Sequence, residues 1–209
     1  MIYRVGLTGG LASGKSTVAE RLRQDGIPVL DADRIVHGLY APGGPGARAV
    51  AEAFGPEFLD ESGAVDRARL AAHVFANPEA LARLNALIHP LVFEEQAGWF
   101  REQERAGHAL GAVEATLLVE TGGRARYDCL IVLSAPEEMR LARAAARNPE
   151  VPVDELRRRV RAQLPDAERE KQADIVLRTD GTKEDLFARV DALAERLRSA
   201  AGDYRSPRR

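Results

Sequence analysis

Short runs of apolar, β-branched residues alternate along the chain with longer stretches in which apolar residues recur at helical spacing. The short runs have the length and composition of buried strands, and each is too short to span a membrane. We expect strands at 2–8, 28–31, 109–114, 129–134 and 174–178. Because helical stretches separate these strands, the pattern predicts an α/β fold, a five-stranded parallel sheet flanked by helices on both faces.

The connection between the second and third predicted strands is far longer than one helix. Helix-like patterns within it cover 48–54, 66–75, 78–88 and 90–105, and the turn-rich stretch 41–46 stands at its entrance. A histidine before a proline usually ends a helix, so we expect His89-Pro90 to separate the last two. The pattern predicts a helical insert over residues 34–106.

A second helical stretch, 136–163, is interrupted by the proline-containing segment 148–152. Two helices divided in this way are typical of a lid over an active site, and we assign the lid to 136–169. A core built on the sheet then comprises 1–33, 107–135 and 170–200, closed by a helix over 183–198. We expect the tail, 201–209, to be disordered.

Composition excludes several classes of protein. The 209 residues are 45% hydrophobic and 30% charged, with a formal net charge of −2 that gives no reason to expect nucleic acid or a membrane as partner. The single Cys129 cannot form an intramolecular disulfide, and no signal peptide is recognisable. We expect a cytoplasmic protein, while the sequence does not indicate its oligomeric state.

The segment Gly9–Ser16 carries the most specific motif of the chain, G-x-x-x-x-G-K-S, between a predicted strand and a predicted helix. In this context successive backbone N–H groups and the helix N-terminus surround phosphate oxygens. Lys15 is then expected to reach the β- and γ-phosphates, and the Ser16 hydroxyl to bind Mg²⁺. The alternative is a glycine-rich turn with an incidental Lys-Ser pair.

Two carboxylates, Asp31 and Asp33, stand at the end of the second predicted strand, at the sheet edge where α/β proteins bind ligands. If this segment is extended, both point the same way, one to orient an acceptor hydroxyl and one to hold Mg²⁺ through water. The alternative is that one of them caps the following helix.

Arginines at 140, 143 and 147 recur at helical spacing and share one face of the predicted lid. Such a face can close on a triphosphate and stabilise the transferred phosphoryl. For Arg143 and Arg147 we favour this role, whereas the later arginines from 157 to 161 suit a solvated surface. Glu114, at the end of the third strand, weakly resembles the acidic residue that stands near Mg²⁺ in a second nucleotide motif. An exposed Glu at a strand end is an equally good interpretation.

These residues together resemble the dephospho-CoA kinase family over nearly the whole chain. Beyond the glycine loop, the likeness is carried by Asp31-Ala32-Asp33 with His37, Pro42-Gly43, Phe54-Gly55, Asp66-Arg67, Val74-Phe75, His89-Pro90, Leu117-Leu118 with Glu120, Arg143, Arg147, Ala162-Gln163 with Pro165, Ala173-Asp174 and Gly181. The resemblance implies a nucleotide-binding core, a helical domain for the acceptor and a lid.

The resemblance also implies ATP-dependent phosphorylation of the ribose 3′-hydroxyl of dephospho-CoA, with Mg²⁺ as cofactor. It assigns catalytic roles to Asp33, Lys15 and Arg143, acceptor binding to Asp33, His89 and Leu117, and metal binding to Ser16 and Asp31. The residues expected to bind ATP are Gly10, Leu11, Ala12, Ser13, Gly14, Lys15, Ser16, Thr17, Arg143, Arg147 and Thr179.

Four positions depart from the family pattern. Ala12 replaces a usual Gly, which the loop accommodates if φ stays negative. Thr116 replaces a Pro and Arg140 a Gln. Thr179 replaces an Asn near the base, and it lacks the paired donor and acceptor of a carboxamide, so the choice between ATP and GTP stays open.

Two other functions remain compatible with the motifs. One is a kinase for another small acceptor, which the Asp-Ala-Asp and His-Pro elements disfavour. The other is a nucleotide-operated binding switch, which would hydrolyse its nucleotide slowly without an acceptor. The chain has no guanine-recognising Asn-Lys-x-Asp.

Overall fold

The computed structural model describes residues 1–205, which divide into two compact units. One, here called the sheet unit, comprises Met1–Leu30 and the chain from Phe100 onward. The other, the helical unit, is Asp31–Trp99. The helical unit overlaps the insert that we predicted over 34–106. Within residues 1–205, no helix is both long and apolar enough to cross a membrane.

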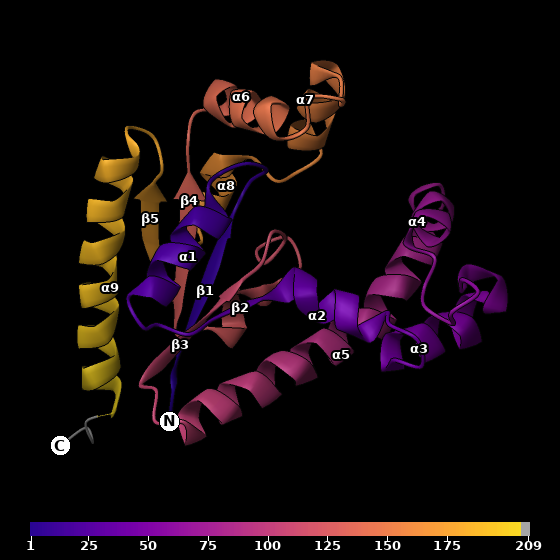
Figure 1. The fold of residues 1–209 in the computed structure, drawn as a ribbon, viewed down its shortest axis with the longest axis horizontal. Helices are drawn as coiled ribbons and strands as arrows, with labels where there is room; N and C mark the ends of the chain where they lie inside the picture. The colour runs from indigo at the N-terminus through magenta and orange to yellow at the C-terminus, as the bar shows by residue number, and fades with distance from the viewer. Residues whose placement is uncertain (206–209) are drawn as a thin grey trace. The chain divides into compact units, whose positions relative to one another are not determined.

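The sheet has five strands in the order β2-β3-β1-β4-β5 (Figure 1). The strands are β1 (Tyr3–Gly9), β2 (Val29–Asp31), β3 (Leu110–Glu114), β4 (Cys129–Ser134) and β5 (Ile175–Arg178). β1 pairs in parallel with β3 and β4, and β4 with β5. All five predicted strands are thereby confirmed, with ends that differ by one residue at most. The central position of β1 places the loop that follows it between β3 and β4.

Helices α1 (Lys15–Gln24) and α9 (Lys183–Arg205) pack together on the sheet. Alternate strand residues, such as Val5 and Leu7 of β1, point into this core because side chains of a strand alternate between its faces. α1 contributes Val18 and Leu22, both fully buried. This apolar contact fixes the N-terminal end of α1, which the glycine loop directly precedes.

Three helices lie between β4 and β5 in the chain: α6 (Glu137–Arg147), α7 (Val153–Arg161) and α8 (Asp166–Glu170). They form what we call the α6–α8 segment, drawn in orange above the sheet in Figure 1. As predicted, residues 148–152 divide it into separate helices. A 3-10 turn, η2 (Gly123–Arg126), lies between β3 and β4.

The helical unit has its own apolar core, which includes Leu39, Val50, Leu70 and Ile88. It consists of α2 (Ala32–Leu39), α3 (Pro45–Phe54), the short η1 (Pro56–Phe58), α4 (Arg67–Phe75) and most of α5 (Pro78–Arg105). The sequence pattern found α3, α4 and α5 but did not delimit α2 as a helix.

One long helix, α5, replaces the two helices that we predicted on either side of His89-Pro90. The prediction of a stop was wrong because apolar residues at helical spacing continue across the proline. Leu84, Ile88 and Val92 all lie in the core of the helical unit. Their burial outweighs the backbone hydrogen bond that Pro90 removes.

The tail prediction is wrong for residues 201–205, which continue α9. Ala201 is fully buried in the sheet-unit core, and the ring of Tyr204 meets that of Tyr3 edge-on, with centroids 5.4 Å apart. These contacts hold the last turns in the helix. Residues 206–209 lie outside the described part of the chain.

Replacing Pro90 with Ala should stabilise the protein, because Ala restores the backbone N–H that α5 lacks at this position. A proline inside a helix costs about 3 kcal/mol relative to Ala. Proline also restricts the unfolded chain, so replacing it favours the unfolded state and cancels part of this gain. We expect the free energy of unfolding in urea to rise by about 1–2 kcal/mol. An unchanged or lower value would mean that α5 depends on the proline.

Replacing Asp191 with Asn should remove a pH-dependent contribution to stability. Arg21 of α1 donates two hydrogen bonds to Asp191 of α9, of 2.6 and 2.8 Å, and holds the pKa of this carboxyl below its usual 3.8. A carboxyl whose pKa is lower in the folded state stabilises the fold above 3.8 and loses this effect as the pH falls. In thermal unfolding measured from pH 7 to pH 2, the Tm of the variant should lie below that of the unchanged protein at neutral pH. This difference should disappear in acid.

Candidate functional site

The glycine loop joins the end of β1 to the start of α1. Gly14 is the N-cap of α1 and has a φ of 93°, a left-handed conformation that favours glycine. The Lys15 ammonium folds back over the loop and donates to the carbonyl oxygens of Gly9 and Gly10, at 2.8 and 3.2 Å. This arrangement leaves a cation at the mouth of a loop built to surround an anion.

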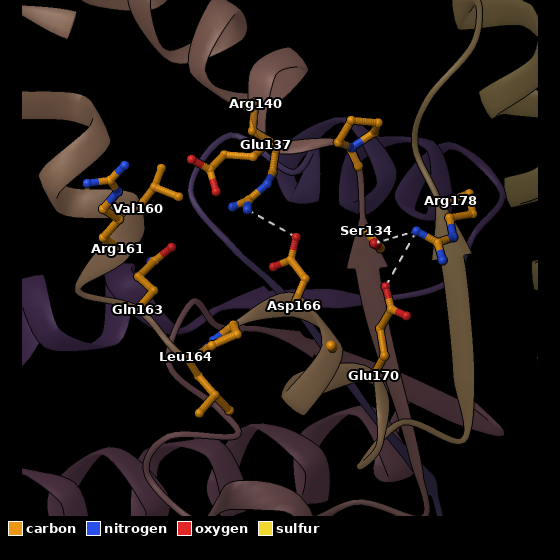
Figure 2. Close-up of a pocket in the computed structure, with 14 residues that line it drawn as sticks. Ser134, Glu137, Arg140, Val160, Arg161, Gln163, Leu164, Asp166, Glu170 and Arg178 are labelled. Atoms are coloured by element: carbon orange, nitrogen blue, oxygen red, sulfur yellow. Dashed lines mark hydrogen bonds and ion pairs between the residues drawn. The ribbon is translucent and has the colours of Figure 1, made fainter. Parts of the chain in front are cut away.

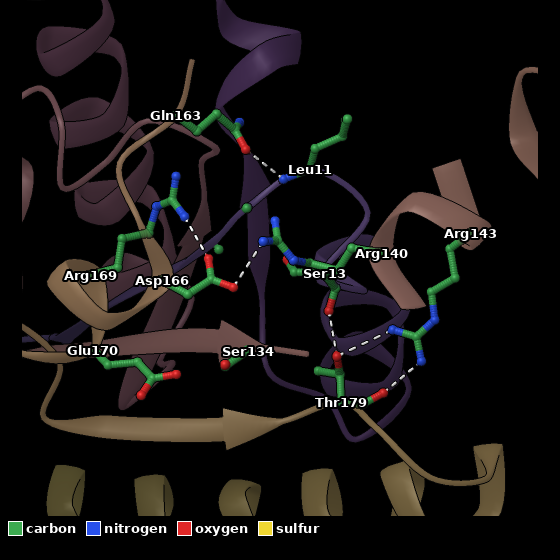
Figure 3. A network of polar contacts seen from close by, with 12 residues as sticks. Leu11, Ser13, Ser134, Arg140, Arg143, Gln163, Asp166, Arg169, Glu170 and Thr179 are labelled. Carbon is green, nitrogen blue, oxygen red and sulfur yellow. Dashed lines mark hydrogen bonds and ion pairs between the residues drawn. The ribbon is translucent and has the colours of Figure 1, made fainter. Parts of the chain in front are cut away.

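Side chains from other parts of the sheet unit hold the loop in place (Figure 3). The buried Thr179, after β5, donates its hydroxyl to the Ser13 carbonyl at 2.7 Å. The Leu11 amide donates to Gln163 Oε1 at 2.8 Å. Both partners belong to segments far from the loop in sequence, so tertiary contacts contribute to the shape of the loop.

Ser16 and Glu114 form the corner of the site suited to a metal. The Ser16 hydroxyl donates to the Glu114 carboxylate at 3.3 Å, and Glu114 is buried at the end of β3. A hydroxyl and a carboxylate are hard oxygen ligands, which Mg²⁺ prefers together with substrate phosphates and water. Within residues 1–205, no three His, Cys, Asp or Glu side chains gather into a metal-binding cluster. The residues present fit Mg²⁺ bound jointly with a phosphate.

A cavity of about 220 Å³ opens beside the loop, between it and the turn after β5. Its lining residues are Gly14, Thr17, Arg143, Arg147, Thr179, Gly181, Thr182, Lys183 and Leu186. Arg143 donates to the Thr179 carbonyl at 2.7 Å and lies 3.4 Å from its hydroxyl. The structure therefore brings Arg143, Arg147 and Thr179 together with the glycine loop, as the sequence prediction requires.

Arg140 does not join that cavity, although it lies one helical turn before Arg143. Its side chain is buried and its guanidinium pairs with Asp166 of α8 at 3.0 Å. A buried charge needs an oppositely charged partner, and Asp166 of α8 supplies it for Arg140. The three arginines therefore divide between two surroundings.

A second and larger cavity, of about 490 Å³, lies among α6, α7 and α8 and the ends of β4 and β5 (Figure 2). Arg140, Asp166, Arg178 and Glu170 line it. Its charges are paired: Arg140 with Asp166, and Arg178 with Glu170 at 3.5 Å. Arg178 also donates to the buried Ser134 hydroxyl at 2.9 Å. The paired charges make this cavity a poor match for an unbalanced anion.

We expected Ala12 to keep a negative φ, but its φ is 55°. It is the only non-glycine residue among 1–205 with a positive φ. This conformation costs a side-chain-bearing residue roughly 1–2 kcal/mol. The Ala12 methyl packs against the small core of Leu141, Ala144 and Leu156 in the α6–α8 segment, which offsets part of the strain.

Asp31 and Asp33 belong to the helical unit and do not share one extended segment. Asp31 ends β2 and caps α2, where its carboxylate accepts the Asp33 amide at 2.9 Å. Asp33 lies in the first turn of the helix and is exposed. The expectation of two parallel carboxylates was wrong, because the Asp31 cap starts the helix one residue after the strand.

His89 and Leu117 lie in different units. His89 is within α5, half-buried, with its ring centroid 5.8 Å from that of Phe93. Leu117 follows β3 in the sheet unit and is 49% exposed. An apolar side chain with this exposure beside a strand end is available to a ligand.

The structure also identifies residues that the sequence analysis left out of the site. Glu114 was only weakly indicated, although its place at the end of a strand adjoining β1 was the available signal. No sequence pattern joined Gln163, Asp166, Arg169 and Glu120 to the glycine loop, because their contacts depend on how α6, α7 and α8 pack.

Comparison with known proteins gives consistent results. The chain matches the dephospho-CoA kinase family over residues 3–185. The dephospho-CoA kinase of Corynebacterium glutamicum is 41% identical over 198 residues, 95% of this chain and 98% of the relative. That of Bdellovibrio bacteriovorus is 40% identical over 193 residues, 92% of this chain and 95% of the relative.

Solved structures share the fold. The crystal structure of TT1252 from Thermus thermophilus has a TM-score of 0.79 and 35% identity, covering 94% of this chain and 98% of its own. The dephospho-CoA kinase from Campylobacter jejuni has a TM-score of 0.72 and 24% identity, with the same coverage.

Replacing Thr179 with Val should weaken the site, because it removes the hydroxyl that satisfies the Ser13 carbonyl. A buried carbonyl without its partner costs about 1–3 kcal/mol. We expect the free energy of unfolding to fall by that amount. The Thr179→Ser variant keeps the hydroxyl and should lose less. A stable Val variant together with a destabilised Ser variant would show that the methyl group, and not the hydrogen bond, matters.

Proposed function

The chain belongs to the dephospho-CoA kinase family and is a kinase of coenzyme A biosynthesis, and we propose that it transfers the γ-phosphoryl group of ATP to the ribose 3′-hydroxyl of dephospho-CoA. The observation that carries this proposal is the preformed glycine loop with Lys15 at its mouth and the arginine-lined cavity beside it. An anion site joined to a cavity of this kind suits a nucleoside triphosphate.

Different parts of the nucleotide are assigned to the glycine loop and to the neighbouring cavity. The amides of residues 10–17 are assigned to the phosphates, except those of Leu11 and Ser13, which donate to Gln163 and to the Gly10 carbonyl. Lys15 exchanges its two carbonyl partners for the β- and γ-phosphate oxygens. The base and ribose are assigned to the cavity beside Thr179 and Arg147. Because the Thr179 hydroxyl is occupied by Ser13, it offers the base little recognition.

Ser16 and Glu114 would hold Mg²⁺ at the entrance to α1. Bound there, the ion would neutralise charge on the phosphate oxygens. Asp31, which we expected beside the metal, uses its carboxylate to cap α2. We therefore place Glu114 ahead of Asp31 as the carboxylate that serves the metal.

Asp33 is proposed to align the acceptor hydroxyl and take its proton. It is exposed in the first turn of α2, directly after the sheet strand β2, and its carboxylate is not used as a cap. The acceptor itself is assigned to the helical unit, including His89, and to Leu117 of the sheet unit. Arg143 is proposed to neutralise the transferred phosphoryl as water is excluded.

The two alternative functions make different predictions in one assay. Incubation with Mg-ATP and dephospho-CoA, with ADP release and product mass followed together, should show ADP only when acceptor is present. ADP formed equally without acceptor would support a nucleotide-operated switch, and phosphorylation of another alcohol would support a different kinase. We further infer a cytoplasmic enzyme without a nucleic-acid partner, in keeping with the net charge of −2.

Replacing Asp33 with Asn should lower kcat by about 10²-fold or more, the usual effect of removing a general base. The affinity for ATP should change little, since the glycine loop is untouched. Glu52→Gln, an exposed carboxylate of the same unit, serves as control and should leave kcat unchanged. Near-normal turnover of the Asp33 variant would exclude its role as the base.

A further inference from the structure

Four charged side chains from α6, α8 and the chain before η2 form a continuous network beside the glycine loop. Arg169 donates to Glu120 through Nε at 3.1 Å and Nη2 at 2.7 Å, and to Asp166 through Nη1 at 2.8 Å. The other oxygen of Asp166 pairs with Arg140 at 3.0 Å. We call Glu120, Arg140, Asp166 and Arg169 the loop-support network (Figure 3 shows all but Glu120).

The network ends directly on the loop at Gly10. A Cβ added to Gly10 would overlap Nη1 of Arg140 and lie 3.3 Å from Nη1 of Arg169. Both guanidinium groups are almost completely buried, with 5% of Arg140 and 1% of Arg169 exposed. Glycine is needed here because the backbone rests on two arginine side chains.

Leu11, the next residue, is held by the same segment in two further ways. Its amide donates to Gln163 Oε1 at 2.8 Å, and its side chain packs with Ala12 against Leu141 and Leu156. The first half of the loop is therefore bound through a cation contact, a hydrogen bond and apolar packing. All three come from the α6–α8 segment.

The network does not add charge to the site, because its two arginines are balanced by two carboxylates. Net electrostatic attraction therefore does not explain how the network would act on a triphosphate. What it supplies is fixed geometry, since a buried guanidinium held by a carboxylate has few other positions.

We propose that Arg140 is a positioning residue, oriented by Asp166, that together with Gln163 fixes Gly10 and Leu11 and thereby sets the course of the phosphate-binding loop before the nucleotide arrives. The inference deepens the proposed function, on which it rests for the identity of the nucleotide. A loop ordered in advance loses less conformational entropy on binding, so the network contributes to nucleotide affinity. It should act equally on ATP and ADP, because residues 10 and 11 are fixed in either case.

The test measures nucleotide binding by calorimetry and kinetics by ADP release. Arg140→Gln should weaken the Kd of both ATP and ADP by roughly 10-fold, as expected when a preorganised loop becomes mobile. It should change kcat by no more than about 3-fold. Arg159→Gln, which removes an exposed arginine of α7 paired with Glu155, is the matched control and should change neither.

A double variant separates positioning from mere stability. Asp166→Asn leaves the buried Arg140 charge without its partner and should lower Tm. Combining it with Arg140→Gln removes both charges and should restore much of the Tm, while nucleotide affinity stays weak because Arg140 no longer supports Gly10. Recovery of affinity together with Tm would overturn the proposal, since it would show that only stability had been lost.

Two further outcomes decide the matter. A loss of kcat with unchanged Kd would overturn the proposal, because Arg140 would then act on the transferred phosphoryl group. If Arg140→Gln does not fold, Gln163→Leu tests the same support through the Leu11 amide and should weaken both nucleotides similarly. The binding measurements need no acceptor, so a failure of the wild-type protein to phosphorylate dephospho-CoA would count against the proposed function and not against this role.

Discussion

The site depends on one constraint: the glycine-rich loop between β1 and α1 must be held in one conformation, although it lies outside the regular hydrogen bonding of strand and helix. Such a loop depends on partners from elsewhere in the fold. Here the loop is held by Thr179 on the Ser13 carbonyl and by Gln163 on the Leu11 amide. The cost of an ordered binding loop is thus met by tertiary contacts.

Burial sorts the arginines of the α6–α8 segment into distinct roles. Arg143 borders the cavity beside the loop, where it bonds to the turn after β5. Arg140, one turn earlier, is buried and neutralised by Asp166. Arg159 pairs with Glu155 at the surface, where an ion pair contributes little. Helical spacing alone placed Arg140 and Arg143 on one face, but it did not distinguish a buried cation paired with a carboxylate from one that lines a cavity.

Strain at Ala12 shows how closely the loop and the α6–α8 segment are adapted to each other. The left-handed conformation disfavours a methyl group, yet that methyl fills space against Leu141 and Leu156. A glycine would relieve the backbone and lose the packing. The α6–α8 segment is therefore joined to the glycine loop through this packing, so that movement of one would disturb the other.

The sequence by itself determined the α/β class, all five strands, the glycine loop and the family, because these depend on local periodicity and on motifs whose spacing is fixed by backbone geometry. It also identified Lys15, Ser16 and Arg143 as site candidates. Only the tertiary structure decided that α5 continues through Pro90, that α9 extends through residue 205, and that Asp31 caps a helix. It alone brought Glu114 to Ser16 and Arg140 to Gly10. These outcomes rest on burial and on contacts between residues far apart in the chain, which no local pattern records.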